Sequence, residues 1–373
     1  MTDPYLSVVA TARNDNHGGD LLPRMQVFVN GLAAQSERFQ LETELVLVEW
    51  NPPADRPKLS DALDWPQTPW CSMRIIEVPN ELHATLEHSD RLPLFQMIAK
   101  NVGIRRAGGE FVLATNVDIL FPDELMAELA ARALQSDTVY RVDRYDVAIT
   151  PDPSLPIDET LRESLKHVVR ICSREGSNDL VDETFYGIAQ EGNLWIRRIR
   201  HLGWALRRRY RDVRAGRLGR LGVKWGVARN LWDAEAARVP LHTNASGDFT
   251  LVSREGWHTT RAYPELEMFS MHIDGLFLYQ AHYAGLDEIV LPHPIYHIEH
   301  THGFKPAPKD IDMLNERLDE AAIPQISNDQ FSRWILTMYQ TKKPIVFNDE
   351  SWGFADQTLP EYDPAPYSEE AHA

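Results

Sequence analysis

Short apolar runs alternate with longer segments of helical periodicity through the first third of the chain, and this alternation is the feature that most restricts its fold. The apolar runs predict β-strands at 6–12, 44–49, 74–78 and 110–115. A turn-rich loop and a helix that begins after Asp20 follow the first strand, and a helix at 93–106 ends at Gly108-Gly109 before the fourth. Strands and helices that alternate in this way form βαβ units, so we predict an α/β fold with a mostly parallel sheet flanked by helices.

This pattern changes twice further along the chain. From 157 to 240, polar helical segments, a basic stretch and several tryptophans replace it, and we interpret this region as a helical basic insertion. The earlier rhythm resumes with a strand near 247–253, a helix near 270–283 and a strand near 287–291, followed by helices near 310–321 and 329–339. A Pro- and acid-rich tail from Pro344 is expected to be loosely held. The expected segments are 1–156 and 241–305, the two halves of one α/β domain, 157–240, the insertion, and 306–373, the C-terminal helices and tail.

Charge is distributed unevenly along the chain. The net charge is −17, which disfavours general nucleic-acid binding because phosphate contacts need a basic surface. Residues 196–229 nevertheless hold twelve Lys or Arg and one acid, so this window carries +11 and the rest of the chain −28. From Trp195 to Val213, apolar residues recur at helical spacing between arginines, which predicts a cationic amphipathic helix. Such a helix either packs on the main domain with a solvated basic face, or contacts anionic lipid or a phosphate-bearing acceptor.

Cysteine content and hydropathy indicate the compartment. Cys71 and Cys172 are too few and too far apart for a disulfide framework, which favours a reducing environment. The N-terminus lacks the positive flank and apolar run of a signal peptide. No stretch approaches the roughly 18 apolar residues of a membrane span. We therefore predict a cytoplasmic protein, with peripheral contact at the inner face of the membrane if the basic helix engages lipid.

The most specific stretch is KNVGIRRAGGEFVLATNVD, from Lys100 to Asp118. Its Asn-x-Gly helix leads through a small-residue turn into a strand ending at Asp118, a carboxylate at a rigid strand tip, which suits a hard cation. This order resembles the donor-binding core of family-two-type GT-A glycosyltransferases, the bacterial polysaccharide or glycolipid type, whose strand ends in a DxD-type metal motif. Asn116 stands where the first acid of that motif is expected. A simpler alternative is that Asn116 and Asp118 only cap the helix that begins near Pro122.

The resemblance implies a Rossmann-like GT-A fold and a nucleotide diphosphate sugar as the donor. It also implies a divalent cation, Mn²⁺ or Mg²⁺, that Asp118 holds against the diphosphate. On the donor side it implies contacts from Lys100, Asn101, Asn116 and Val117.

Two further strand ends are expected in the same crevice, because ligands of open α/β sheets collect at the carboxyl ends of strands. The first strand continues through Thr11, Ala12 and Arg13 to Asp15. The resemblance implies that this segment meets the nucleotide base and that Arg13 reaches a phosphate, which a guanidinium matches bidentately. Glu49 ends the second strand, where relatives carry an acid near the base and ribose. A structural salt bridge of Arg13 or Glu49 is the competing interpretation.

The stretch 244–285 resembles the acceptor side of the same families, with a Gly-led strand, an Arg-x-x-Trp turn, a Pro-Glu loop and a helix that opens with an acid. The resemblance implies acceptor contacts from Trp257 and Glu265, and it gives Asp274 the place of the general base of inverting members. Such a base is needed, because an acceptor hydroxyl is a poor nucleophile until its proton is removed. Ile273 replaces the glutamate that precedes this aspartate in relatives. The alternative is an ordinary acid at a helix N-terminus.

A histidine-rich segment follows the strand predicted at 287–291. It contains His293, His297, His300 and His302. Many GT-A enzymes complete their metal shell with a histidine here, and imidazole is a competent ligand for Mn²⁺-like ions. We assign this ligand to His300, with His297 and His302 as alternatives. A closed zinc site is disfavoured because neither cysteine lies near.

These features together predict a metal-dependent, inverting transfer of a sugar from a nucleotide diphosphate sugar to a saccharide or lipid-linked acceptor. Retention stays open, since the base assignment rests on the spacing of Asp274 alone. Nucleotidyl transfer would use the same sheet, but the N-terminal Gly-rich, Lys-bearing phosphate loop of that class is absent. The departures at Asn116 and Ile273 leave a catalytically inactive sugar- or lipid-binding module as the non-enzymatic alternative.

Overall fold

The structure is a computed structural model, which describes residues 4–187, 239–300 and 308–364. The cationic helix predicted at 195–213, the rest of the basic window and His302 lie outside the described residues. The contact with lipid or with a phosphate-bearing acceptor therefore stays a prediction.

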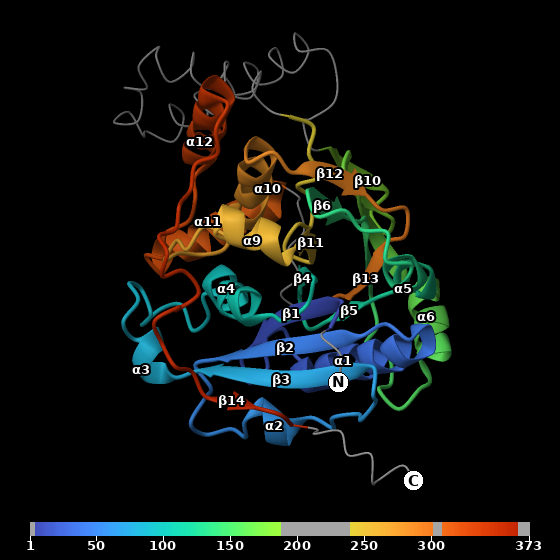
Figure 1. Ribbon diagram of the computed structural model, residues 1–373. Helices are drawn as coiled ribbons and strands as arrows, with labels where there is room; N and C mark the ends of the chain where they lie inside the picture. The colour runs from blue at the N-terminus through green and yellow to red at the C-terminus, as the bar shows by residue number, and fades with distance from the viewer. Residues whose placement is uncertain (1–3, 188–238, 301–307, 365–373) are drawn as a thin grey trace.

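A large mixed sheet forms the centre of the molecule (Figure 1). In the described residues its four central parallel strands are β1 (Leu6–Ala12), β2 (Thr43–Trp50), β3 (Cys71–Val78) and β4 (Phe111–Thr115). Its outer strands are β6 (Thr138–Arg141), β11 (Phe249–Ser253), β12 (Asp287–Val290) and β14 (Glu361–Tyr362). The order is β12-β6-β11-β4-β1-β2-β3-β14, with β11 antiparallel to both neighbours and β14 antiparallel to β3.

Both faces of the parallel strands are covered. Val9 of β1 packs into a core cluster with α4 (Gln96–Arg106), whereas Val8 and Ala10 pack on the opposite face with α1 (Leu21–Phe39). Every residue of β1 is buried, which explains why its sequence is a continuous apolar run and not an alternation. The predicted α/β class, with a largely parallel sheet flanked by helices, is confirmed.

The helices form a layer on each side of this sheet (Figure 1). On the α1 side lies α5 (Asp123–Ala130). On the α4 side lie α9 (Arg254–Thr260), α10 (Ile273–Tyr283) and α12 (Asn328–Thr341). The other described helices are α2 (Leu59–Ala62), α3 (Asn80–His83), α6 (Ile157–Lys166) and α11 (Pro308–Glu320).

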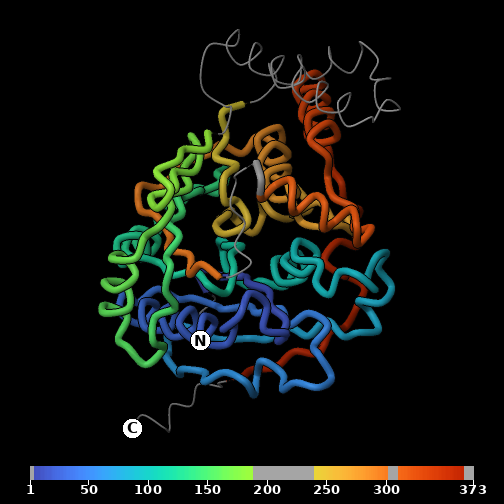
Figure 2. The backbone as a smooth tube through the Cα atoms, turned by 180° about the vertical axis from the view of Figure 1, so that it is seen from behind, coloured from blue at the N-terminus to red at the C-terminus, as the bar shows by residue number. Residues whose placement is uncertain are grey.

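A second, smaller sheet contains part of the predicted insertion. In the described residues its order is β10-β9-β8-β7-β13-β5. Its strands are β5 (Ile119–Leu120), β7 (Arg144–Val147), β8 (Val168–Cys172), β9 (Gly176–Asp179), β10 (Thr184–Gly187) and β13 (Ile295–Ile298). Only α6, which lies beside α1 (Figure 2), is helical in the described part of the region predicted as a helical insertion. The strands β8, β9 and β10 are the other regular elements of this described part, and the β-branched residues of β8 pair with β7.

The tail beyond Pro344 is packed against the domain up to residue 364, which corrects the expectation that it is loosely held. Trp352 is buried, and the guanidinium of Arg105 lies 4.7 Å from its ring centre. Arg106 donates to the carbonyls of Gly353 at 2.6 Å and Phe354 at 2.8 Å. The tail then adds β14 to the edge of the sheet (Figure 1). Charged hydrogen bonds to main-chain oxygens hold this segment despite its polar composition.

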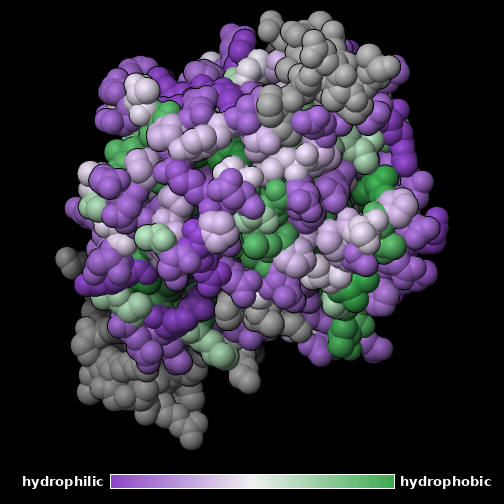
Figure 3. All heavy atoms as spheres, turned by 90° about the horizontal axis from the view of Figure 1, so that it is seen from below, coloured by the Kyte–Doolittle hydropathy of each residue, from purple (hydrophilic) through white to green (hydrophobic). Residues whose placement is uncertain are grey.

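The surface seen from below is mainly hydrophilic, with apolar side chains in separate groups (Figure 3). Among the described residues, no helix combines the length and apolar character needed to cross a membrane.

Candidate functional site

The carboxyl ends of β4, β1 and β2 meet at one edge of the large sheet. β1 lies between the other two strands, and Ala12 is opposite Glu49 in the parallel register. Thr11 Oγ1 donates to Val48 O at 3.2 Å, which ties the two strand ends together. Asn116 and Asp118 follow β4 at the same edge. The topology therefore brings the predicted strand-end residues to one region, where ligands of α/β sheets bind.

Asp118 lies beside two imidazoles. Its Oδ2 is 3.8 Å from His297 Nε2 and 3.7 Å from His300 Nε2. One potential ligand atom from each of the three residues lies within 4.8 Å of the others. The arrangement arises because β13 pairs antiparallel with β5, which sets His297 opposite Ile119, directly after Asp118. The predicted pair of Asp118 and His300 is thus joined by His297, one of the two alternatives.

Arg24 also contacts this carboxylate, and the sequence analysis missed it. Its Nη1 donates to Asp118 Oδ2 at 2.6 Å, and its Nη2 donates to the carbonyls of His17 at 2.6 Å and Gly19 at 3.1 Å. Arg24 is only 1% exposed. Arg24 could have been recognised from the sequence, because it lies with Leu21 and Phe28 on the apolar face of α1, where a charged side chain is out of place.

The donor set of this cluster fits a divalent cation. Asp118 Oδ1 and His300 Nδ1 are buried and have no hydrogen-bond partner among the described residues. Burial lowers the pKa of His300 to about 4, so its imidazole is neutral and able to ligate at neutral pH. Burial by itself would lower the pKa of His297. The Asp118 charge and the Asp146 hydrogen bond outweigh burial, so the pKa of His297 is raised overall. Arg24 donates to Oδ2, the oxygen that also lies beside both imidazoles, so an ion would share this carboxylate with the Arg24 guanidinium, whereas Oδ1 accepts no hydrogen bond from the described residues.

Asn116 and Lys100 form hydrogen bonds within the protein near the carboxyl end of β4. Lys100 is fully buried, and its Nζ donates to Asn116 Oδ1 at 2.8 Å and Gly247 O at 2.5 Å. Asn116 Nδ2 donates to Asp248 Oδ1 at 2.5 Å. Burial lowers the pKa of Lys100 to about 8. Val117 between these groups is 6% exposed and belongs to the core on the α1 side.

Asp274 lies in the first turn of α10 and is half-buried. Its Oδ2 accepts a hydrogen bond from Ser246 Oγ at 2.8 Å. Ile273, Leu276 and Phe277 of this helix are buried in the core. The negative charge of Asp274 is one of three, with Asp248 and Asp118, that oppose the fall in the Lys100 pKa. Asp248, Asp274 and Asp118 therefore all lie close enough to the buried Lys100 ammonium group to act on it electrostatically.

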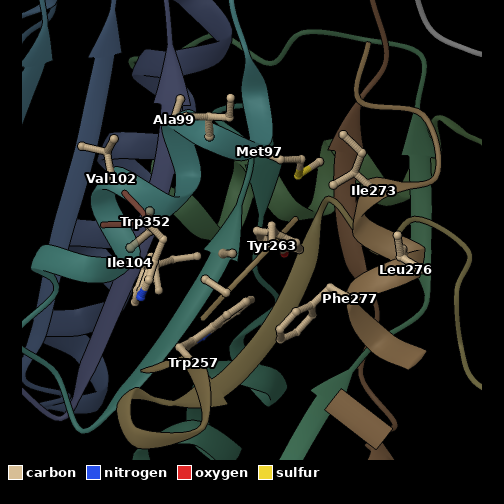
Figure 4. Close-up of a cluster of buried hydrophobic side chains, with 14 of the residues drawn as sticks. Met97, Ala99, Val102, Ile104, Trp257, Tyr263, Ile273, Leu276, Phe277 and Trp352 are labelled. Atoms are coloured by element: carbon tan, nitrogen blue, oxygen red, sulfur yellow. The ribbon is translucent and has the colours of Figure 1, made fainter. Parts of the chain in front are cut away.

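Two residues assigned to substrate contacts belong to the core instead. Trp257 is 0% exposed, stacks on Phe277 with ring centres 4.4 Å apart, and donates from Nε1 to Val112 O at 2.9 Å (Figure 4). Asn101 is also 0% exposed and donates from Nδ2 to Tyr263 O at 2.8 Å. Neither side chain has a solvent-accessible surface with which to contact a substrate, so both expectations are corrected, and the same holds for the donor contact expected of Lys100, which is also 0% exposed.

Glu265, the other expected acceptor contact, is partly buried and bonds within the protein. Its Oε1 accepts from Asn101 Nδ2 at 3.0 Å and from Gly353 N at 2.7 Å. Burial raises the pKa of its carboxyl group. The Glu265 side chain therefore joins α4 to the C-terminal tail in this structure.

Arg13 borders an open cavity of about 450 Å³ beyond the ends of β1, β2 and β3. Arg13 Nε donates to Asn51 O at 2.8 Å and its Nη1 to Asp15 Oδ2 at 3.0 Å, so its salt bridge is with Asp15 and not with Glu49. The other lining residues are Asn51, Asn80, His83, Ala84, Ser89, Asp90, Arg91 and Pro93. The cavity is polar and lies at the sheet edge where the nucleotide was expected.

Glu49 is 1% exposed and points away from solvent. Its Oε1 accepts from Leu59 N at 2.9 Å, whereas Oε2 is buried without a hydrogen-bond partner among the described residues. Burial raises the pKa of this carboxyl to about 7 from its ordinary 4.5. The folded protein therefore favours the protonated form of Glu49.

We expect Glu49→Gln to make the protein more stable than wild type at alkaline pH, and to a smaller extent or not at all near pH 4.5. Between 4.5 and 7 the folded state holds a proton on Glu49 that the unfolded state has released, so wild-type stability falls with rising pH. One such proton changes the free energy of unfolding by about 1.4 kcal/mol per pH unit. Urea unfolding at several pH values measures this difference, and parallel curves for the two proteins would contradict it.

Comparison with solved structures finds a structural likeness over most of the chain. The chain is similar to the crystal structure of S. aureus TarS, residues 1–349, in complex with UDP-GlcNAc, with 14% sequence identity and a TM-score of 0.37. The match covers 90% of this chain and 72% of that chain. No protein-family model matches the chain, and no curated protein matches it.

Proposed function

We propose that the protein is a glycosyltransferase that moves a sugar from a nucleotide diphosphate sugar to a saccharide or lipid-linked acceptor, with inversion at the anomeric carbon and with a divalent cation. The observation that carries the proposal is the buried group of Asp118, His297 and His300 at the carboxyl edge of the sheet. Asp274 acts electrostatically on the same Lys100 ammonium group as Asp118, and its partly exposed carboxylate is available as a base. A cation ligand set and a carboxylate base are the two parts that this chemistry needs.

Asp118, His297 and His300 would hold the cation. One carboxylate and two imidazoles suit Mn²⁺ better than Mg²⁺, because Mg²⁺ prefers an all-oxygen shell and keeps its waters. When bound, the cation would supply positive charge to the leaving diphosphate. The proposal therefore includes His300 as the preferred histidine ligand and Mn²⁺ as the ion.

The protein groups would act on the donor and the acceptor from opposite ends of the site. In the proposed step the acceptor hydroxyl oxygen attacks the anomeric carbon, the bond from that carbon to the diphosphate oxygen breaks, and the hydroxyl proton passes to Asp274. Ser246 holds the Asp274 carboxylate through its 2.8 Å hydrogen bond. The cavity beside Arg13 would take the base and ribose, with Arg13 exchanging its Asp15 contact for a phosphate.

Ligand binding and turnover together test this function. We expect one nucleoside diphosphate out of the uridine, guanosine, cytidine, thymidine and adenosine series to raise the melting temperature with Mn²⁺ and much less without it. The matching nucleotide sugars should be hydrolysed slowly when no acceptor is present. Binding without hydrolysis or transfer would favour the inactive sugar-binding module, and pyrophosphate release from a nucleoside triphosphate and a sugar phosphate would favour nucleotidyl transfer.

A further inference from the structure

A buried chain of charged groups stands behind His297, on the side away from Asp118. His297 Nδ1 lies 3.0 Å from Asp146 Oδ1, and Asp146 is 0% exposed. Asp146 Oδ2 accepts from Arg170 Nη1 at 2.7 Å and from Arg144 Nη2 at 3.2 Å. Nothing in the sequence analysis singled out these three residues.

The two arginines are themselves anchored. Arg170 Nη2 donates to Glu299 Oε1 at 2.7 Å. Arg144 pairs with Asp248, which in turn accepts the 2.5 Å hydrogen bond from Asn116. The charged chain thus connects the two sides of the Asp118 strand tip, and it holds the Asp146 carboxylate in one orientation.

The ionisation of Asp146 decides where the proton of His297 lies. Asp146 is buried against two guanidinium groups, those of Arg170 at 2.7 Å and Arg144 at 3.2 Å, and this pairing favours its ionised carboxylate. An ionised carboxylate only accepts hydrogen bonds, so Nδ1 of His297 must carry the hydrogen. In the neutral imidazole the lone pair is then on Nε2, the atom 3.8 Å from Asp118 Oδ2.

We propose that Asp146, held by Arg144 and Arg170, is a positioning residue that fixes His297 in the Nδ1–H tautomer with Nε2 directed at the cation site. The orientation of the ring follows from contacts within the protein, and its purpose rests on the proposed function. A carboxylate behind a ligating imidazole fixes the tautomer and raises the basicity of the ligand. Asp146 does not itself reach the cation or the substrate.

The variant Asp146→Asn keeps the shape of the side chain, removes its charge and can reverse the hydrogen bond to His297. Two guanidinium groups donate hydrogen bonds to the Oδ2 position, whereas Arg144 Nε lies 2.8 Å from Oδ1 without forming one, so the oxygen of the new amide side chain would be drawn to the Oδ2 position and its nitrogen would face His297. That nitrogen is a donor, and Nδ1 would have to become the acceptor. The hydrogen of His297 would therefore move to Nε2, where it blocks the lone pair.

Nitrogen-15 NMR of the histidine side chains tests the tautomer in metal-free protein at alkaline pH. The His297 signal is identified by its loss in His297→Gln. We expect the Nδ1–H form in wild type and a shift toward the Nε2–H form in Asp146→Asn. An Nε2–H form in wild type overturns the proposal even if the variant fails to fold, and an unchanged tautomer in a folded variant also overturns it.

Cation binding supplies the second readout, with Mn²⁺ alone followed by electron paramagnetic resonance. Asp146→Asn should weaken Mn²⁺ binding about 10- to 100-fold, the usual effect of losing the partner of a metal-bound histidine. Asp143→Asn is the matched control, because Asp143 Oδ1 lies 2.9 Å from Nε2 of His242, a histidine that is not part of the cluster. Control affinity equal to wild type supports the proposal, and equal losses in both variants contradict it.

The two experiments separate this inference from the proposed function. If wild type binds no Mn²⁺, the cation assignment fails, while the tautomer measurements still decide whether Asp146 sets the orientation of His297. If wild type binds Mn²⁺ and Asp146→Asn binds it equally well with a folded core, the positioning role fails and the cation assignment stands.

Discussion

Asp118→Asn is expected to remove Mn²⁺-dependent binding of the nucleoside diphosphate, with a loss in affinity of at least about 100-fold. Losing an outer partner of a metal ligand already costs about 10- to 100-fold, and here a proposed ligand itself loses its charge. The asparagine oxygen can still accept the hydrogen bond from Arg24, so Arg24 keeps all three of its contacts with Asp118, His17 and Gly19. Calorimetry with and without Mn²⁺ measures the change.

The choice of substitution matters because the pair is buried. Side-chain exposure is 2% for Arg24 and 8% for Asp118, and removing one member of such a pair typically costs about 3–5 kcal/mol of stability. Asp118→Ala would therefore combine a folding defect with a binding defect. Asp123→Asn is the matched control, since Asp123 also pairs with an arginine, Arg38, but at the surface. Mn²⁺-dependent affinity that survives in Asp118→Asn would refute the cation assignment.

Asp274→Asn should leave donor binding intact and lower the rate of sugar transfer by about 10²- to 10⁴-fold, the usual contribution of a positioned general base. An amide has the same shape as the carboxylate and can still accept the hydrogen bond from Ser246. It cannot take up the proton of the acceptor hydroxyl. Steady-state kinetics with the donor and acceptor found by screening give kcat, and calorimetry gives donor affinity.

An acidic residue in the first turn of another helix, α12, provides the control for a helix-dipole effect. Asp329 lies in the first turn of α12, where it pairs with Arg333 at 2.6 Å. Asp329→Asn removes the same charge from the same helical position, at a cost of about 0.3–1 kcal/mol in stability, and should leave transfer unchanged. Similar losses of turnover in both variants would show that the Asp274 effect is one of stability, and near-normal turnover in Asp274→Asn would exclude it as the base.

The central sheet was predictable because each of its strands is specified locally. β1 was predicted at its observed bounds, and β2, β3 and β4 to within a few residues, since each is a short apolar run bounded by a turn signal. The same holds for α10, which lies within the helix predicted near 270–283 and in which most residues, but not Asp274, are buried. Parallel strands joined by helices then place their carboxyl ends at one edge.

Other features depended on contacts between residues far apart in the chain. β8, β9 and β10 are short, partly exposed strands that exist because they pair with β7 and with one another, a signal that is weak in sequence. The resemblance implies an acceptor contact for Trp257, whereas its side chain stacks on Phe277 in the core (Figure 4). The sequence around a tryptophan in a turn motif does not indicate whether its side chain points into the core or toward solvent.

The sequence by itself determined the α/β class, the strand ends that meet at one sheet edge, and the residue types suited to a cation and a base. Local apolar periodicity and chain order are enough for these, because they act over a few residues at a time. Only the tertiary structure decided that Arg24, His297 and His300 converge on Asp118, and that Asp146 lies behind His297. Burial makes each of these charged groups depend on a partner distant in sequence, and only the folded chain brings such partners together.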